Sequence, residues 1–168
     1  MKKFFIFILV ILYFSAKAQT TSTDYFISIK QEIFDSDTCC WRQLSNSKKY
    51  EESAELVVEY LNKSKQITNR HSLNWHAGQL FAMANKNDIA KTYFKKTYSI
   101  FYKLFGDDDA KTWYYYAKGT VAFIDRDKIK LKRIIEKWER NFEKDKNYQT
   151  LIILLEKWGN SYQEALIH

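Results

Sequence analysis

The chain has 168 residues, of which 46% are hydrophobic and 28% charged, with no proline, four glycines, two cysteines and a formal net charge of +7. This composition excludes collagen-like, low-complexity and cysteine-rich scaffolds. Because residues that break helices are scarce, we expect an all-α fold of long helices joined by short turns.

The first eighteen residues have the pattern of a secretory signal peptide. Lys2 and Lys3 precede an apolar run over residues 4–14, and Ala16 and Ala18 provide the small residues of a cleavage site. The run is far shorter than the ~20 residues that a membrane-spanning helix needs. We therefore expect cleavage at residue 18 and a secreted mature chain, periplasmic or extracellular. A single-pass anchor is the alternative interpretation.

Removal of this segment lowers the net charge from +7 to +4, because the segment contains three lysines and no acidic residue. A nucleic-acid-binding protein usually concentrates a large positive surplus on one face. Export and this modest charge together argue against a nucleic-acid partner. The most apolar later stretch is residues 151–155, so we expect no stable membrane span after cleavage.

Apolar residues then recur at helical spacing in segments separated by polar turns, which predicts seven or eight helices. The predicted helices span residues 23–34, 47–66, 72–84, 88–104, 107–124, 128–142 and 147–158, with a short last helix after Gly159. The expected N-caps include Thr23, Ser47, Ser72, Asn147 and Ser161, the last in a capping box with Glu164. Residues 85–87 and 125–127 are predicted turns.

Cys39 and Cys40 are adjacent and are the only cysteines, in a segment predicted to be a loop together with Trp41. A loop-closing disulfide within the chain is therefore impossible. In an oxidising compartment the pair could stay as buried thiols, form a vicinal bridge or link two chains. We divide the sequence into the signal peptide (1–18), an N-terminal helix with the Cys-Cys loop (19–46) and a helical domain (47–168).

Gly106 is expected to end the fourth helix in a left-handed conformation. The three aspartates that follow, residues 107–109, lie where the fifth helix begins, and acidic side chains there satisfy free backbone N–H groups. A calcium site is the alternative, but adjacent aspartates lack the alternating ligand positions of a calcium loop.

Gly78, Phe81, Ala90 and Phe94 have offsets of 0, 3, 12 and 16. This pattern resembles the signature of tetratricopeptide repeats, in which small residues let paired helices approach and aromatic rings fill the space between them. The next helix pair retains only Gly119, and residues 161–165 and 50–54 resemble incomplete units. The resemblance covers about two-thirds of the mature chain and implies stacked antiparallel helix pairs, a tetratricopeptide-like α-solenoid.

In tetratricopeptide arrays, the first helix of each pair lines a concave groove that binds peptides or partner helices. The resemblance therefore implies that this chain binds a peptide or protein through large amphipathic side chains, which binding hot spots favour. The groove positions implied are Trp75, Gln79, Ala82, Trp113, Tyr116, Thr120 and Phe123. The alternative is that these residues form the core. Trp75, His76, Gln79 and residues 120–131 also resemble segments of uncharacterised secreted bacterial proteins, which implies no function.

No motif with catalytic spacing occurs, so we expect a non-enzymatic protein without a cofactor. His71 and His76 do not have the i, i+4 spacing that places two metal ligands on one helix face, and no glutamate accompanies them. A small metal-dependent or acid–base hydrolase using His76 is one alternative, and a structural subunit of an envelope assembly is another.

The helix over residues 128–142 is the most regular, with Leu131, Ile135, Trp138 and Phe142 on one stripe. Residues 126–140 carry seven basic and three acidic side chains, a surplus equal to that of the whole mature chain. We interpret the basic side as a solvated outer face. A patch for anionic lipid, glycan or an acidic partner is the alternative.

Overall fold

The computed structural model describes residues 25–142 and 145–167, and all regular structure within these ranges is helical. The predicted signal peptide, its cleavage site and Thr23 lie outside them. The elements are α2 (Gln31–Phe34), α3 (Cys40–Asn46), α4 (Tyr50–Lys63), α5 (Arg70–Met83), α6 (Asn87–Phe94), the 3-10 turn η1 (Lys95–Thr97), α7 (Ile100–Phe105), α8 (Asp108–Ile124), α9 (Lys128–Phe142), α10 (Lys146–Glu156) and α11 (Tyr162–Leu166). None of the described helices is long and apolar enough to cross a bilayer.

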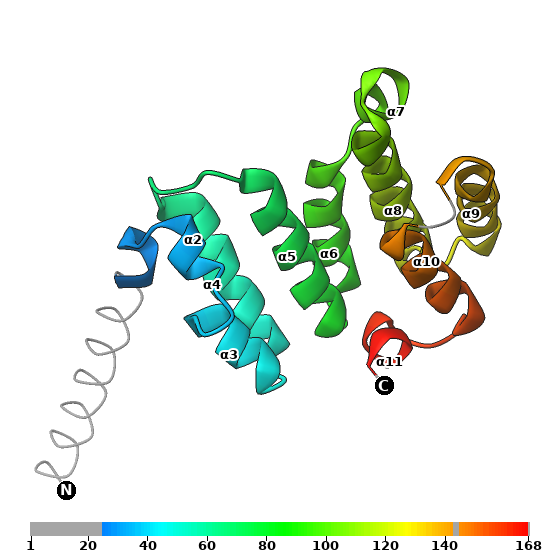
Figure 1. Cartoon of the computed structure of the whole chain (residues 1–168). Helices are drawn as coiled ribbons and strands as arrows, with labels where there is room; N and C mark the ends of the chain where they lie inside the picture. The colour runs from blue at the N-terminus through cyan, green and yellow to red at the C-terminus, as the bar shows by residue number, and fades with distance from the viewer. Residues whose placement is uncertain (1–24, 143–144, 168) are drawn as a thin grey trace, which may run out of the picture.

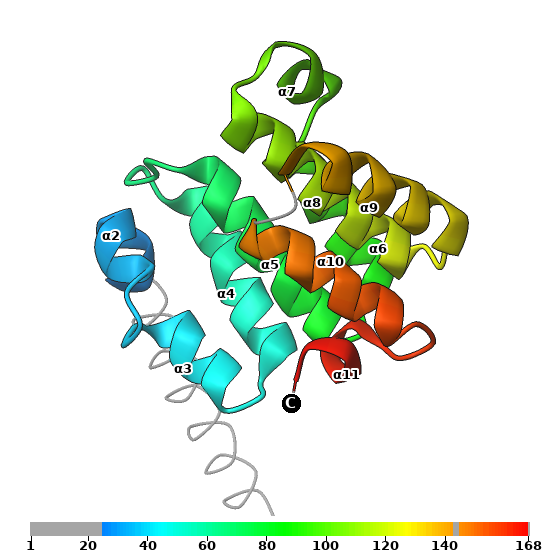
Figure 2. The same cartoon turned by 45° about the vertical axis from the view of Figure 1, so that its right-hand side comes forward.

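Helix α5 runs antiparallel to both α4 and α6, and α8 and α9 form a second antiparallel pair beside them (Figure 1). Helix α10 packs on both α8 and α9, and α11 contacts α5 (Figure 2). Helix α7 projects from one end of the molecule. The C-terminal helices therefore lie across the row formed by the earlier ones and close one of its faces.

The apolar stripes predicted from the sequence form one continuous core. It is rich in rings and in small residues, including Phe34, Tyr60, Phe94 and Trp138, which are fully buried. In α9, the predicted stripe is confirmed for Leu131, Ile135 and Trp138, whereas the side chain of Phe142 lies outside the described residues. Burial of these stripes supplies most of the favourable free energy of folding.

Three of the inter-helix turns share one geometry. Lys48, Asn85 and Arg126 each have a φ near +60° and follow α3, α5 and α8, respectively. At each turn, this residue's N–H bonds the carbonyl three residues back and the next N–H bonds the carbonyl five residues back. This is the Schellman pattern, which satisfies free carbonyls at a helix end. The turns predicted at 85–87 and 125–127 are thus confirmed.

The predicted helix over residues 88–104 is wrong, because the chain leaves the helical path at Tyr98 (φ −145°). The carbonyl oxygen of Thr97 accepts hydrogen bonds from His71 Nε2 (2.6 Å) and Trp113 Nε1 (2.7 Å). Thr97 Oγ1 also donates to the carbonyl of Phe94. Side chains from α5 and α8 therefore occupy the Thr97 carbonyl oxygen, which would accept a backbone hydrogen bond if the helix continued. The chain turns at this point, and α7 starts in a new direction.

The predicted loop around the cysteines is also wrong, because residues 40–46 form α3. Trp41 Nε1 donates to the carbonyl of Phe34 (2.8 Å), and Ser53 Oγ donates to the carbonyl of Trp41 (2.6 Å). These bonds draw the indole inward, where it is buried. The helix over residues 23–34 is likewise not continuous, since residues 25–28 are helical and α2 begins at Gln31. These breaks give more helices than the seven or eight predicted.

The predicted helix starts are correct in part. Asp107 Oδ1 accepts from Ala110 N (2.8 Å), and Ser161 and Glu164 form the expected capping box. Asn69 caps α5 by accepting from Ser72 N. Asp145, not Asn147, caps α10, and α4 begins after Lys49 without a side-chain cap, so Ser47 does not cap it. The predicted cap Ser72 is therefore wrong, since its N–H is the donor to Asn69. Several polar residues lie within three positions of each helix start, so sequence alone does not decide which of them is the cap.

Gly106 does not adopt the predicted left-handed conformation, since its φ of −75° and ψ of 162° are extended. A Cβ atom here would collide with the carbonyl oxygen of Tyr102 and with the Cβ of Ala110. The glycine is therefore required by a close approach between α7 and α8 rather than by a positive φ.

Gly78 provides a test of the close packing between α5 and α6. A Cβ atom at this position would lie 2.7 Å from Cδ1 of Phe94, whose ring is fully buried and packs on Trp75. We expect Gly78→Ala to lower the free energy of unfolding by about 1–2 kcal/mol, because the steric conflict outweighs the gain in helix propensity. Urea denaturation followed by circular dichroism measures this change.

Phe94→Ala is the matched background for that test, because it removes the Cγ, Cδ1 and Cε1 atoms that an added Cβ would meet. In this background, Gly78→Ala should cost less than half as much, which a double-mutant cycle reports as a coupling between the two sites. Equal costs in both backgrounds would contradict the packing described.

Candidate functional site

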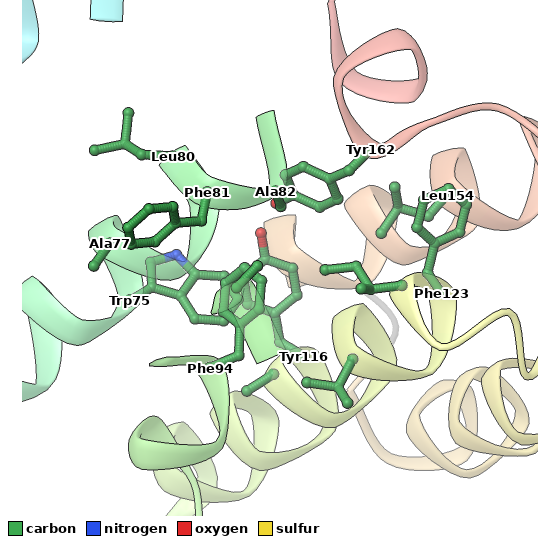
Figure 3. Close-up of a cluster of buried hydrophobic side chains, with 14 of the residues drawn as sticks. Trp75, Ala77, Leu80, Phe81, Ala82, Phe94, Tyr116, Phe123, Leu154 and Tyr162 are labelled. Atoms are coloured by element: carbon green, nitrogen blue, oxygen red, sulfur yellow. The ribbon is translucent and has the colours of Figure 1, made fainter. Parts of the chain in front are cut away.

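The predicted groove residues lie mostly in the core. Trp75 and Tyr116 are each 6% exposed, Phe123 is 1% exposed, and Thr120 and Ala82 are fully buried. Figure 3 shows the Trp75, Tyr116 and Phe123 rings among Tyr162 of α11 and Leu154 of α10. Burial raises the pKa of Tyr116 to about 12 and also raises the pKa of Tyr162. These side chains do not offer a recognition surface.

The packing of the C-terminal helices explains why the predicted groove residues are buried. A Cβ atom at Gly119 would collide with Leu151, so the small residue of α8 receives α10 closely. Trp113 is only half-buried, but its indole N–H is used by Thr97 and its ring packs on Trp75 (4.8 Å between centroids). Gln79 is half-buried as well. The face predicted to be an open groove is therefore filled by the chain itself.

The two histidines nearest to each other in sequence have separate structural contacts. His71 donates to the Thr97 carbonyl. His76 lies 3.2 Å from Ser72 Oγ and packs on the Trp41 ring, and burial lowers its pKa. Within the described residues, no group of three histidine, cysteine or acidic side chains is arranged to hold a metal ion. The geometry does not bring His71, His76 and the aspartates at 107–109 together.

Cys39 and Cys40 are half-buried thiols with their Sγ atoms 2.8 Å apart. Cys39 is the N-cap residue of α3 and Cys40 is its first residue. Burial, followed by the hydrogen bond to Cys39, raises the pKa of the Cys40 thiol. A thiol with a raised pKa is a weak nucleophile at neutral pH. The bridged forms stay predictions.

Helix α7 presents an apolar surface to solvent. Phe105 is 78% exposed and Phe101 66% exposed, and their rings stack at 6.2 Å between centroids. Ile100 and Leu104 are also exposed and fall within the same arc of the helix. Scattered exposed apolar residues are ordinary, but a contiguous group on a projecting helix marks an interaction surface. This surface was not predicted from the sequence, because residues 100–104 were expected to continue the helix over residues 88–104.

A basic cleft of about 180 Å³ lies beside α7, between α8 and α9. Among the described residues, its lining combines five cationic side chains with two phenol rings and one isoleucine, and includes no carboxylate. The lining residues are Lys103, Tyr114, Tyr115, Lys118, Lys130, Arg133, Ile134 and Lys137. Lys103 belongs to α7, so α7 borders the cleft through this residue.

Four of the five cations of this cleft form no ion pair within the part of the chain that the structure describes. Lys103, Lys118, Lys130 and Arg133 form no ion pair with any other residue in the described ranges. Lys118 Nζ instead donates to Tyr114 Oη (2.6 Å). A larger cleft of about 410 Å³ near α4 differs, because its Lys49 pairs with Glu52 at 3.3 Å. These four cations therefore give the cleft between α8 and α9 a positive potential.

Part of this cleft could be found in the sequence. The basic surplus of residues 126–140 is a visible signal, interpreted above as a solvated face with a binding patch as the alternative. The contributions of Tyr114, Tyr115 and Lys118 could not be found in the same way. Which side of α8 lies in the core and which side lines the cleft depends on how α9 and α10 pack against it.

Comparison with protein-family models, curated proteins and solved structures found no match to this chain.

The contrast between Tyr116 and Phe105 tests which aromatic residues are structural. We expect Tyr116→Ala to lower the free energy of unfolding by about 3–5 kcal/mol, because it leaves a cavity in the core. Phe105→Ala removes a ring of the same size from a solvated position, so its effect should stay within about 0.5 kcal/mol. Thermal and urea unfolding of the two variants measure the difference, and similar losses in both would contradict the assignment.

Proposed function

We propose that this chain is an exported, non-enzymatic helical protein that binds another protein through the apolar surface of α7. The observation that carries the proposal is the group of four exposed apolar side chains on one arc of a projecting helix. Burying two phenylalanine rings in a partner contributes about 1.5–3 kcal/mol each. The predicted signal peptide supports export, and the structural contacts of His71 and His76 favour a binding role over catalysis.

We further propose that the helices form a degenerate tetratricopeptide-like array. The support comes from the shared Schellman turns after α3, α5 and α8, and from the contact of Gly78 with Phe94, which joins α5 to α6 as small residues do in such repeats. The binding surface proposed here differs from the concave groove of those arrays, since α10 and α11 fill the corresponding face.

A second copy of this chain is a poorer partner for the apolar surface of α7 than a different protein is. A two-fold symmetric dimer built on α7 would place the same surface on both sides. Each copy would then bring its cationic cleft towards the other, and like charges across an interface disfavour association. A different protein does not carry this electrostatic cost.

Site-specific photo-crosslinking tests the proposal. A benzoylphenylalanine residue in place of Phe105, in the exporting cells, should give a discrete adduct with another protein. Ile33, which is 53% exposed on α2 and remote from α7, is the control position. The adduct should be absent there.

The adduct identifies a protein whose binding is then measured with purified components. Phe101→Ser together with Phe105→Ser should weaken binding by at least about tenfold while leaving the unfolding transition unchanged. An adduct of twice the mass of this chain, a lipid adduct, or equal crosslinking from Ile33 would each contradict the proposal.

A further inference from the structure

We infer that the basic cleft beside α7 selects an acidic peptide segment, one that carries carboxylates next to apolar side chains. This inference rests on the proposed function and adds the chemical class of the partner. It follows from three properties of the cleft: the positive charge of Lys103, Lys118, Lys130 and Arg133, the apolar and phenolic side chains in its lining, and its border on α7 at Lys103.

The positive charge of the cleft favours an anionic ligand. Lys103, Lys118 and Lys130 line the cleft and are half-buried. Partly buried lysines pack their aliphatic stems on protein and keep the ammonium group in water. Arg133 adds a planar guanidinium that can hold a carboxylate through two parallel hydrogen bonds. A carboxylate entering here meets several donors that none of the described acidic residues occupies.

The position of Lys118 is set by an aromatic neighbour. Its Nζ atom lies 4.9 Å from the centre of the Tyr114 ring and donates to the hydroxyl of the same residue. A lysine held in one place loses less conformational entropy when it binds an anion than a freely moving lysine does. The phenol hydroxyl remains able to donate a hydrogen bond of its own to an incoming oxygen.

The floor of the cleft favours an anion with an apolar neighbour. Tyr114, Tyr115 and Ile134 provide carbon surface in the same lining as the cations. Free inorganic anions have no surface to place there. A peptide segment with glutamate or aspartate next to leucine or phenylalanine matches both features at once.

The concave shape favours a peptide over an anionic membrane. A volume of about 180 Å³ accepts one or two side chains, whereas a bilayer offers headgroups on a broad surface. The cations of α9 that face away from the cleft, such as Lys132, would serve a membrane equally well. Binding of a peptide in the cleft requires only the cations that line the cleft.

Fluorescence anisotropy with synthetic peptides tests the inference on the full mature chain. The probe is a labelled amphipathic peptide with glutamate and leucine or phenylalanine at helical spacing. Its neutral counterpart has every glutamate replaced by glutamine. We expect the acidic probe to bind at least about tenfold more tightly, with an affinity that falls as salt is raised.

Two double variants with the same change in net charge distinguish binding in the cleft from a general effect of the protein's net charge. Lys130→Glu with Arg133→Glu should weaken binding of the acidic probe by at least about tenfold. Lys132→Glu with Arg140→Glu makes the same change in net charge on exposed residues outside the cleft, and it should change binding less than about threefold. Circular dichroism and thermal unfolding confirm that both double variants remain folded.

Three outcomes would overturn the inference: equal affinity for the acidic and glutamine probes, equal losses in the two double variants, or displacement of the acidic probe by phosphatidylglycerol vesicles but not by phosphatidylcholine vesicles. These results are distinguishable from failure of the proposed function. A protein adduct at Phe105 that is insensitive to the Lys130 and Arg133 substitutions would retain the α7 interface and remove only the acidic specificity.

Discussion

The carbonyl oxygen of Thr97 is the contact on which the candidate site depends. His71 from α5 and Trp113 from α8 both donate to it, so one acceptor joins helices that are distant in sequence and ends the helical path after α6. Each bond contributes about 1 kcal/mol net. Their structural effect is larger than that energy, because they turn α7 outward and leave its apolar residues without cover.

The close packing of small residues determines which face of the molecule stays open. Gly78 receives the Phe94 ring and Gly119 receives Leu151, so α5 approaches α6 and α8 approaches α10 more closely than any side chain would allow. Once α10 is seated on α8, α11 brings Tyr162 beside Phe94 and Phe123. The aromatic residues that a repeat pattern assigns to a groove thereby become core.

The remaining surface is electrostatically uneven. Several carboxylates of the described residues are paired locally, as in Lys91 with Asp88 and Asp125, and such exposed pairs contribute little to stability. The cleft between α8 and α9 instead collects cations, of which Lys103, Lys118, Lys130 and Arg133 form no ion pair with the described residues. Unpaired charge does not stabilise the fold, since like charges repel. Its presence beside an exposed apolar helix is better explained by recognition.

The sequence by itself determined the helical class, the apolar stripes of α4, α5, α8 and α9, the turns at residues 85–87 and 125–127, and the capping box at Ser161. These features depend on interactions between residues a few positions apart, and their periodicity is visible in one dimension. The break at Thr97, the helix around Trp41, the burial of Trp75 and Tyr116, and the exposure of Phe101 and Phe105 were decided only by the tertiary structure. Each depends on a group brought from a remote segment, and local periodicity carries no information about which remote group arrives.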